Sequence, residues 1–218
     1  MKHLKILGLA AVAALALMAV FGAGAASASA VLCATEADGG TIANATCTRG
    51  GTKQLPNPST IEWTLRSGTV AEITSTFDNW KCTESKISGT VTNGATGTGS
   101  IEAVTFSGCT DSFGGTCTMD TSASATNKWP FTVTANVPHD GNGGLHLSNI
   151  TLKWGCPIGT CRYTASTATP TVTGGETATI LTSKVALSRE EVSSFGCSAT
   201  ATWSGAYRVT KPDSFWAY

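Results

Sequence analysis

The sequence has little charge and very little histidine. Only 13% of its 218 residues are charged, with 14 basic and 14 acidic side chains, and three residues are histidine. Such a sparse and balanced charge offers no basic surface to nucleic acid or to an anionic membrane, so we expect neither as a partner. The scarcity of histidine also leaves few groups for metal binding or proton transfer near neutral pH.

Long apolar runs are absent after the first thirty residues, which argues against a transmembrane helix in the mature chain. The one such run covers residues 6–21, follows Lys2 and Lys5, and precedes the cleavage signal Ala28-Ser29-Ala30. This order is typical of a Sec-type signal peptide. We therefore predict a signal peptide over residues 1–30 and a single disulfide-stabilised domain over residues 31–218. That domain would be secreted or attached non-covalently to the cell envelope.

Recognised catalytic and metal-binding motifs are also missing. There is no G-x-S-x-G or S-x-x-K segment. His139 and His146 flank the glycine-rich residues 140–144, which we interpret as a turn with surface histidines. A calcium loop beginning at Asp140 would need a glutamate where Thr151 stands, so that motif fails.

Paired carboxylates of the glycosidase type cannot be identified either. Glu62, Glu72 and Glu102 occupy outward or uncertain strand positions and are interpreted as solvated surface groups. We predict no catalytic residue, no cofactor and no metal site, and hence a protein that is not an enzyme. A hydrolase of unrecognised type remains an open alternative.

Cysteine, by contrast, is abundant. An even number of cysteines in an exported chain indicates disulfides. A zinc site is the alternative, but only Cys156 and Cys161 are close in sequence, and they lack the nearby histidine or second cysteine pair that such a site needs. The eight cysteines are Cys33, Cys47, Cys82, Cys109, Cys117, Cys156, Cys161 and Cys197.

Threonine occurs 36 times, and segments with an apolar residue at every second position recur along the chain. Both features are typical of strands with one buried and one wet face. Residues 61–65, 131–137 and 197–209 show the alternation most clearly, and a change of phase at Ser148-Asn149 suggests a bulge. We predict an all-β fold, an antiparallel sandwich (Ig-like or a related Greek-key sandwich) with a barrel as the alternative.

The strand pattern also suggests disulfide pairs. A hairpin at Asn93-Gly94 would bring Cys82 close to Cys109. Cys33 with Cys47 would fix the N-terminal segment, and Cys161 with Cys197 would join the last long strand to an earlier one, which leaves Cys117 with Cys156. One short helix beginning at Ser188 is possible, with a loop as the equal alternative.

Aromatic residues are the best candidates for ligand contact. Trp63, Trp154 and Trp203 lie on the apolar phase of their strands and are expected in the core. Trp80 and Trp216 stand near a predicted turn and in the C-terminal tail, so we select them as possible ligand contacts, for example with a sugar ring.

Three segments resemble a family of uncharacterised secreted proteins of soil actinobacteria: GSIEAVTFSGCT (99–110), TGGETATI (173–180) and CSATATWSGAYRVTKP (197–212). The resemblance extends to the N-terminal MKHLKILGLAAVAALALMA and to the VLC that follows the cleavage signal. It implies export and a β fold. Members of the family often lack counterparts of Cys117 and Cys156, which is consistent with an added bridge, and the family has no known activity to transfer.

Three functional hypotheses remain. The first is a secreted or envelope-associated structural or interaction protein without enzymatic activity. The second is a carbohydrate-binding module, and the third is the unrecognised hydrolase. The expected partner is a cell-wall or extracellular polysaccharide, or a protein.

Overall fold

The computed structural model describes residues 28–35, 47, 52–93, 97–121, 123, 126–136, 140–157, 159–190 and 197–218. The elements within these segments are all strands, which confirms the predicted all-β class. The strands are β1 (Ala28–Ser29), β2 (Leu32–Thr35), β3 (Thr52–Gln54), β4 (Ser59–Leu65), β5 (Ala71–Ser75), β6 (Asn79–Thr92), β7 (Gly97–Thr110), β8 (Thr116–Thr121), β9 (Trp129–Ala135), β10 (Gly143–Cys156), β11 (Gly159–Ala168), β12 (Thr171–Thr173), β13 (Thr179–Arg189), β14 (Thr200–Lys211) and β15 (Trp216–Ala217).

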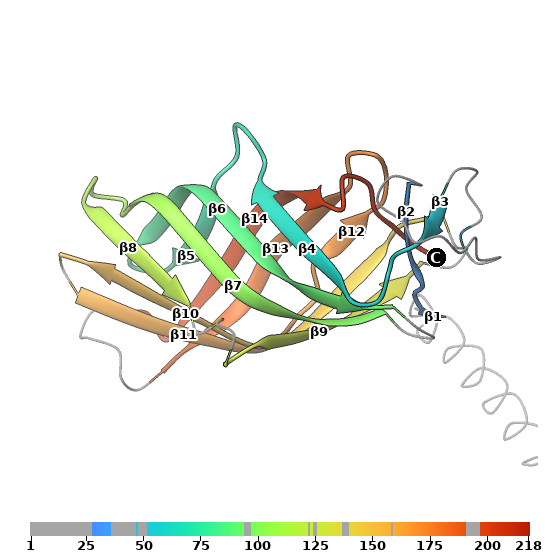
Figure 1. The fold of residues 1–218 in the computed structure, drawn as a ribbon. Helices are drawn as coiled ribbons and strands as arrows, with labels where there is room; N and C mark the ends of the chain where they lie inside the picture. Colours follow the sequence, from blue (N-terminus) through green and yellow to red (C-terminus); the bar gives the residue numbers. More distant parts are fainter. Residues whose placement is uncertain are drawn as a thin grey trace, which may run out of the picture.

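The main sheet closes on itself. Antiparallel pairing continues around the wall from β6 to β14, and β14 returns to pair with both β4 and β5. Three positions in the wall are shared by two strands each, namely β4 with β5, β8 with β9, and β11 with β12. The result is an up-and-down barrel whose two walls face each other across one core, as the layers of a sandwich do (Figure 1).

Alternating side chains fill this barrel. In β14, Ala201, Trp203, Tyr207 and Val209 are buried and alternate with threonine, serine and arginine, so the single long strand predicted for residues 197–209 is largely confirmed. Trp63 and Trp154 are also at most 4% exposed, as expected for the core. The outer face is dominated by small polar residues, which lets a chain with little charge keep a wet surface.

Glycine permits a close approach between two strands of the wall. A Cβ atom on Gly89 in β6 would lie 2.0 Å from the carbonyl oxygen of Ser100 in β7. The register of β6 and β7 shifts between Ser88 and Gly89. Glycine therefore marks a bend of the wall, where any side chain would push the strands apart.

A second, smaller sheet covers one end of the barrel. It consists of β15, β2 and β3, and Figure 1 shows it at the end where the C-terminus lies. Leu32 of β2 and Phe215 beside β15 pack into the barrel's hydrophobic core. The buried Asn93 side chain fixes this cap, because its Oδ1 accepts a hydrogen bond from the Leu32 N–H at 3.0 Å and its Nδ2 donates to the Leu32 carbonyl at 2.7 Å.

All four predicted disulfides are confirmed. Cys33–Cys47 lies at the capped end, where it packs with Trp216 and Tyr218. The other three gather toward the opposite end, which we call the stapled end. They are Cys82–Cys109, Cys117–Cys156 and Cys161–Cys197. Four disulfides indicate an oxidising compartment.

Two local predictions need correction. The buried positions of β10 do change phase at Ser148-Asn149, and Asn149 has a φ of +59°. The pairing with β11 skips Asn149 and the opposite Ser166 without a shift of register, so both strands are interrupted together and neither carries the extra residue of a bulge. Ser188 belongs to β13 and does not cap a helix, while residues 191–196, the rest of that possible helix, lie outside the described residues. Within the described segments, no helix has the length and apolar character that crossing a membrane requires.

Candidate functional site

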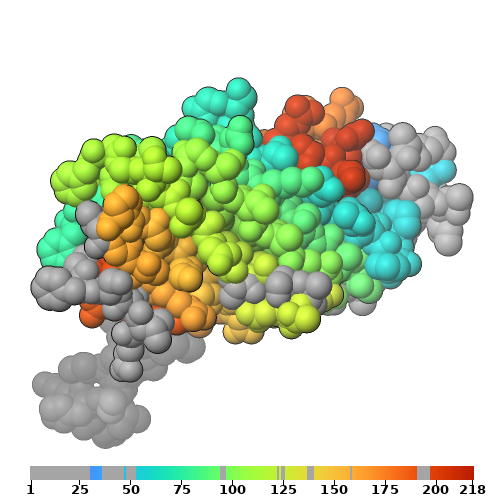
Figure 2. All heavy atoms as spheres, turned by 60° about the vertical axis from the view of Figure 1, so that its left-hand side comes forward, coloured from blue at the N-terminus to red at the C-terminus, as the bar shows by residue number. Residues whose placement is uncertain are grey.

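Neither of two internal cavities lined by the described residues of the barrel is large enough for a ligand. Two internal cavities measure about 10 Å³ each. One lies among Trp63, Trp129 and Trp203, and the other lies beneath Leu32 and Phe215. Each is about large enough for one water molecule at most. Figure 2 shows the outer wall closed over β7, β8 and β10.

The two tryptophans selected from the sequence are buried, which corrects the expectation that they contact a ligand. Trp80 is 4% exposed, and its ring lies 5.5 Å from that of Trp154 and 6.1 Å from that of Tyr163. Trp216 is 3% exposed and packs against the Cys33–Cys47 disulfide. Neither residue presents a ring face to the surface.

Two phenylalanines that we did not select are the aromatic residues on the described surface with large exposed areas. Phe77 is 71% exposed and Phe113 is 79% exposed. Phe77 lies in the turn between β5 and β6, and Phe113 lies in the turn between β7 and β8, both at the stapled end. Each stands among residues that favour turns, in STFDN (75–79) and DSFGG (111–115). An aromatic residue at the tip of such a turn is the sequence signal that could have identified these two exposed side chains.

The turn that carries Phe113 is held rigidly by Asp111. One carboxylate oxygen, Oδ1, accepts the backbone N–H of Phe113 at 3.0 Å and that of Gly115 at 2.7 Å. The backbone N–H of Asp111 donates to the Gly115 carbonyl at 3.0 Å, and Gly114 supplies the positive φ of +83° that the turn needs. The carboxylate is therefore engaged in shaping the turn.

A second aspartate joins the two turns. Oδ1 of Asp78, which directly follows Phe77, accepts hydrogen bonds from the backbone N–H of Ser112 at 3.0 Å and from the Ser112 hydroxyl. The same oxygen accepts the N–H of Asn79 at 2.8 Å. Because Ser112 directly precedes Phe113, these bonds fix the two phenylalanine-bearing turns against each other. We call Phe77, Phe113 and the turns that carry them the aromatic end.

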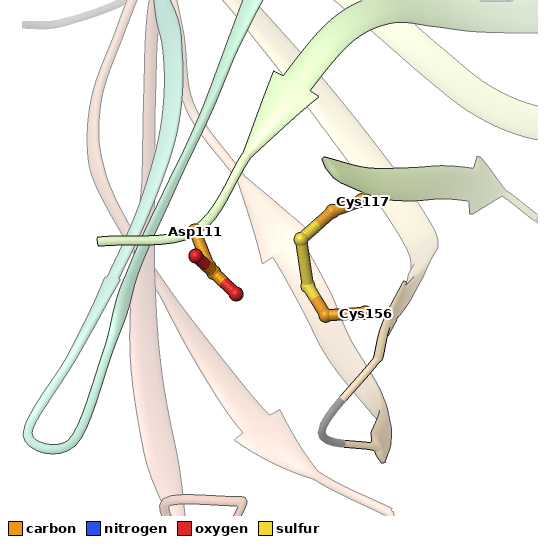
Figure 3. A group of neighbouring side chains, drawn as sticks. All are labelled: Asp111, Cys117 and Cys156. Carbon is orange, nitrogen blue, oxygen red and sulfur yellow. A yellow bond between two sulfur atoms is a disulfide. The ribbon is translucent and has the colours of Figure 1, made fainter. Parts of the chain in front are cut away.

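A group beside this end has the composition of a metal site but not its chemistry. Ligand atoms of Asp111, Cys117 and Cys156 lie within 4.8 Å of one another. Figure 3 shows that the two sulfur atoms are bonded to each other, as the Cys117–Cys156 disulfide requires. A disulfide supplies no thiolate, and the Asp111 carboxylate already accepts two backbone bonds. This group staples the turn and does not hold a metal ion.

A polar groove lies on the side wall where β4 ends and β5 has not yet begun. β4 pairs with β6 as far as Lys86, and β5 resumes the pairing at Cys82. The intervening gap forms a depression of about 280 Å³. Five of its eight lining residues carry hydroxyl groups; the lining consists of Thr64, Leu65, Thr83, Glu84, Ser85, Lys86, Thr105 and Ser107.

The glutamates that could serve as paired catalytic carboxylates are engaged in surface ion pairs. Glu72 lies 3.6 Å from the Lys81 ammonium. Glu102 lies 2.5 Å from Lys128, and hydrogen bonding from that lysine lowers the pKa of Glu102 below its usual 4.5. Both pairs lie on the outside of the barrel, where solvent screens them.

Glu62 carries the most extended of these networks. Its carboxylate lies 2.8 Å from Lys86 of β6 and 3.1 Å from Lys211 of β14, so one charge ladder crosses three strands. Hydrogen bonds from Lys86 and then from Lys211 lower the pKa of Glu62 below 4.5. A lowered folded-state pKa means that the stabilisation is present at neutral pH and is lost as the pH falls through that pKa.

Replacing this residue should therefore have a small, pH-dependent effect. We expect Glu62→Gln to lower the free energy of unfolding by about 0.5–1 kcal/mol at pH 7, because both lysines are more than half exposed and solvent weakens the pairs. Denaturant titrations of both proteins at several pH values check this. The difference in unfolding free energy between the two proteins should shrink below pH 4.5. An equal difference at every pH would contradict a stabilising role for the ion pairs of Glu62.

The barrel and its surface define a class of protein, a disulfide-stapled all-β domain with a filled interior and exposed aromatic turns at one end. Comparisons with protein-family models, with curated proteins and with solved structures found no match. The function must therefore be inferred from the site itself.

Proposed function

We propose that the protein is a secreted or envelope-associated, non-enzymatic protein that binds a partner through the aromatic end. The observation that carries the proposal is the exposure of Phe77 and Phe113, at 71% and 79%, on turns that are fixed in place. Burying a phenylalanine side chain fully is worth about 1.5–3 kcal/mol. Two such rings on a rigid support form a contact that loses little conformational entropy on binding.

The surroundings favour a partner without strong charge. Two ion pairs lie near this end, Lys81 with Glu72 at 3.6 Å and Arg162 with Glu190 at 2.9 Å. Asp78 and Asp111 are buried and turned toward backbone donors. A neutral extracellular polysaccharide or the surface of another exported protein fits this environment better than nucleic acid does.

The proposal is tested with a double variant, Phe77→Ser with Phe113→Ser. The exported protein is incubated with isolated cell envelopes and with a panel of neutral polysaccharides, and the bound fraction is measured. We expect the variant to bind at least about tenfold more weakly than the wild type, because both anchoring rings are lost.

Leu181→Ser is the matched control, because Leu181 is also exposed, at 49%, but lies on β13 and outside the aromatic end. This variant should bind as the wild type does. Equal binding of the wild type and the double variant would overturn the proposal, as would a comparable loss in the Leu181 control.

The lack of catalytic activity is supported by how the titratable side chains are used. His146 is exposed, and its Nε2 contacts the Thr134 hydroxyl at 3.4 Å. Glu62, Glu72 and Glu102 face lysines on the outer wall. A hydrolase screen in which a single carboxylate substitution abolished turnover would contradict this part of the proposal.

Carbohydrate binding in the side-wall groove is a second candidate, favoured by its hydroxyl-rich lining. Glu84 accepts a hydrogen bond from Ser107 at 2.5 Å, and Leu65 adds an apolar surface for the carbon skeleton of a sugar. Titration with soluble oligosaccharides should show binding that Thr105→Val weakens and that Glu102→Gln, outside the groove, leaves unchanged. Binding unaffected by Thr105→Val would exclude this site.

A further inference from the structure

The segment just before β2 is part of the barrel wall. β1 pairs antiparallel with β9, with Ala28 opposite Ala135 and Ser29 opposite Thr134. β7 covers the same edge of β9 but stops at Gly97, which is opposite Val133. β1 therefore continues the wall from the point at which β7 ends and covers the last two residues of β9.

Ala30 completes this junction. It is fully buried, its N–H donates to the Val133 carbonyl at 3.3 Å, and its carbonyl accepts the N–H of Gly97 at 2.7 Å. One residue thus satisfies backbone groups of both β9 and β7. Gly97 and Val133 are themselves buried, so these groups have no direct access to water.

Cleavage after Ala30 would remove both contacts. The Val133 carbonyl and the Gly97 N–H would each lose a partner, and a buried polar group without a partner destabilises a fold. The contact of Val31 does not distinguish cleavage after Ala30 from cleavage further upstream. The Val31 nitrogen donates to the Tyr218 carbonyl at 2.6 Å, and the new amino group left by cleavage after Ala30 could keep that bond. The contacts of Ala30 are the ones that differ.

Two further segments upstream meet the same small-residue requirement, Ala26-Ser27-Ala28 and Ala23-Gly24-Ala25. We propose that signal peptidase cuts on the N-terminal side of Ser29, so that Ser29 and Ala30 remain in the mature protein as part of the barrel wall. This inference rests on the proposed export and moves the boundary expected after residue 30 toward the N-terminus.

The mass and N-terminal sequence of the exported protein test the inference directly. The expected first residue is Ser29 or Ala26, from cleavage at either upstream signal. A first residue of Val31 or later overturns the inference while leaving export intact. Retention of the uncut chain inside the cell would instead contradict export itself.

Thermal unfolding of two oxidised proteins, one beginning at Ser29 and the other at Val31, gives an independent test. The shorter protein should unfold at a midpoint at least about 5 °C lower, because it lacks the Ala30 contacts. Equal midpoints would show that Ala30 is dispensable and would also overturn the inference.

Discussion

Reduction of the four disulfides is expected to unfold the protein at 37 °C, since small exported domains commonly depend on their bridges at that temperature. The bridges span sequence separations of 14, 27, 39 and 36 residues, and each should stabilise by about 3–4 kcal/mol on the chain-entropy model. The four loops do not overlap in sequence, so their contributions should come close to adding. Their total is comparable with the whole stability of an ordinary domain, about 5–15 kcal/mol.

Far-ultraviolet circular dichroism with and without a thiol reductant measures this effect. The oxidised protein should keep its strand signal on heating well beyond the temperature at which the reduced protein has lost it. Cys33→Ala with Cys47→Ala provides a graded comparison, because this bridge closes the shortest loop and lies at the capped end. A reduced protein with the same unfolding midpoint as the oxidised one would contradict a fold that depends on its bridges.

Trp154→Ala is expected to lower the free energy of unfolding by about 3–5 kcal/mol, far more than a substitution on the outer wall. Trp154 is 1% exposed, packs against Trp80, and its indole N–H donates to the Cys156 sulfur at 2.8 Å. Removing the ring would leave a large cavity beside the disulfide at the stapled end. Equilibrium unfolding in denaturant gives the difference.

Two comparison variants separate the causes. Trp154→Phe keeps most of the ring volume and should cost less than half as much. Phe113→Ala removes an aromatic ring that is 79% exposed, so it should change stability by no more than about 0.5 kcal/mol. A loss of stability in the Phe113 variant as large as that of Trp154→Ala would mean that Phe113 supports the fold and is not available for binding.

The fold was predictable to the extent that it is local. Alternation along the strands indicated the all-β class, and the hairpin between Cys82 and Cys109 followed from the turn residues Asn93-Gly94. The other three bridges were only suggested by the order of the segments, with Cys117–Cys156 as the remaining pair, because eight cysteines allow 105 connectivities. Closure of the sheet through β14 and β4 joins segments far apart in the chain, and no periodicity within either segment indicates which edge it will meet.

The candidate site was less predictable, because burial of a single aromatic residue depends on its neighbours. Trp80 shares its strand face with Cys82, which is 0% exposed, so its burial was available from the strand phase. Trp216 lies in β15, where both residues are buried and alternation gives no guide. Phe77 and Phe113 were missed because an apolar residue is expected in the core unless the turn that carries it is recognised.

Peptide mapping of the unreduced protein by mass spectrometry tests the central claim most directly, namely that a closed barrel is locked at both ends by oxidised cysteines. The account predicts four cross-linked peptides that join Cys33 to Cys47, Cys82 to Cys109, Cys117 to Cys156 and Cys161 to Cys197, with no free thiol among the eight. Free thiols in the protein isolated without reductant, or a bridge between any other two of these cysteines, would contradict it.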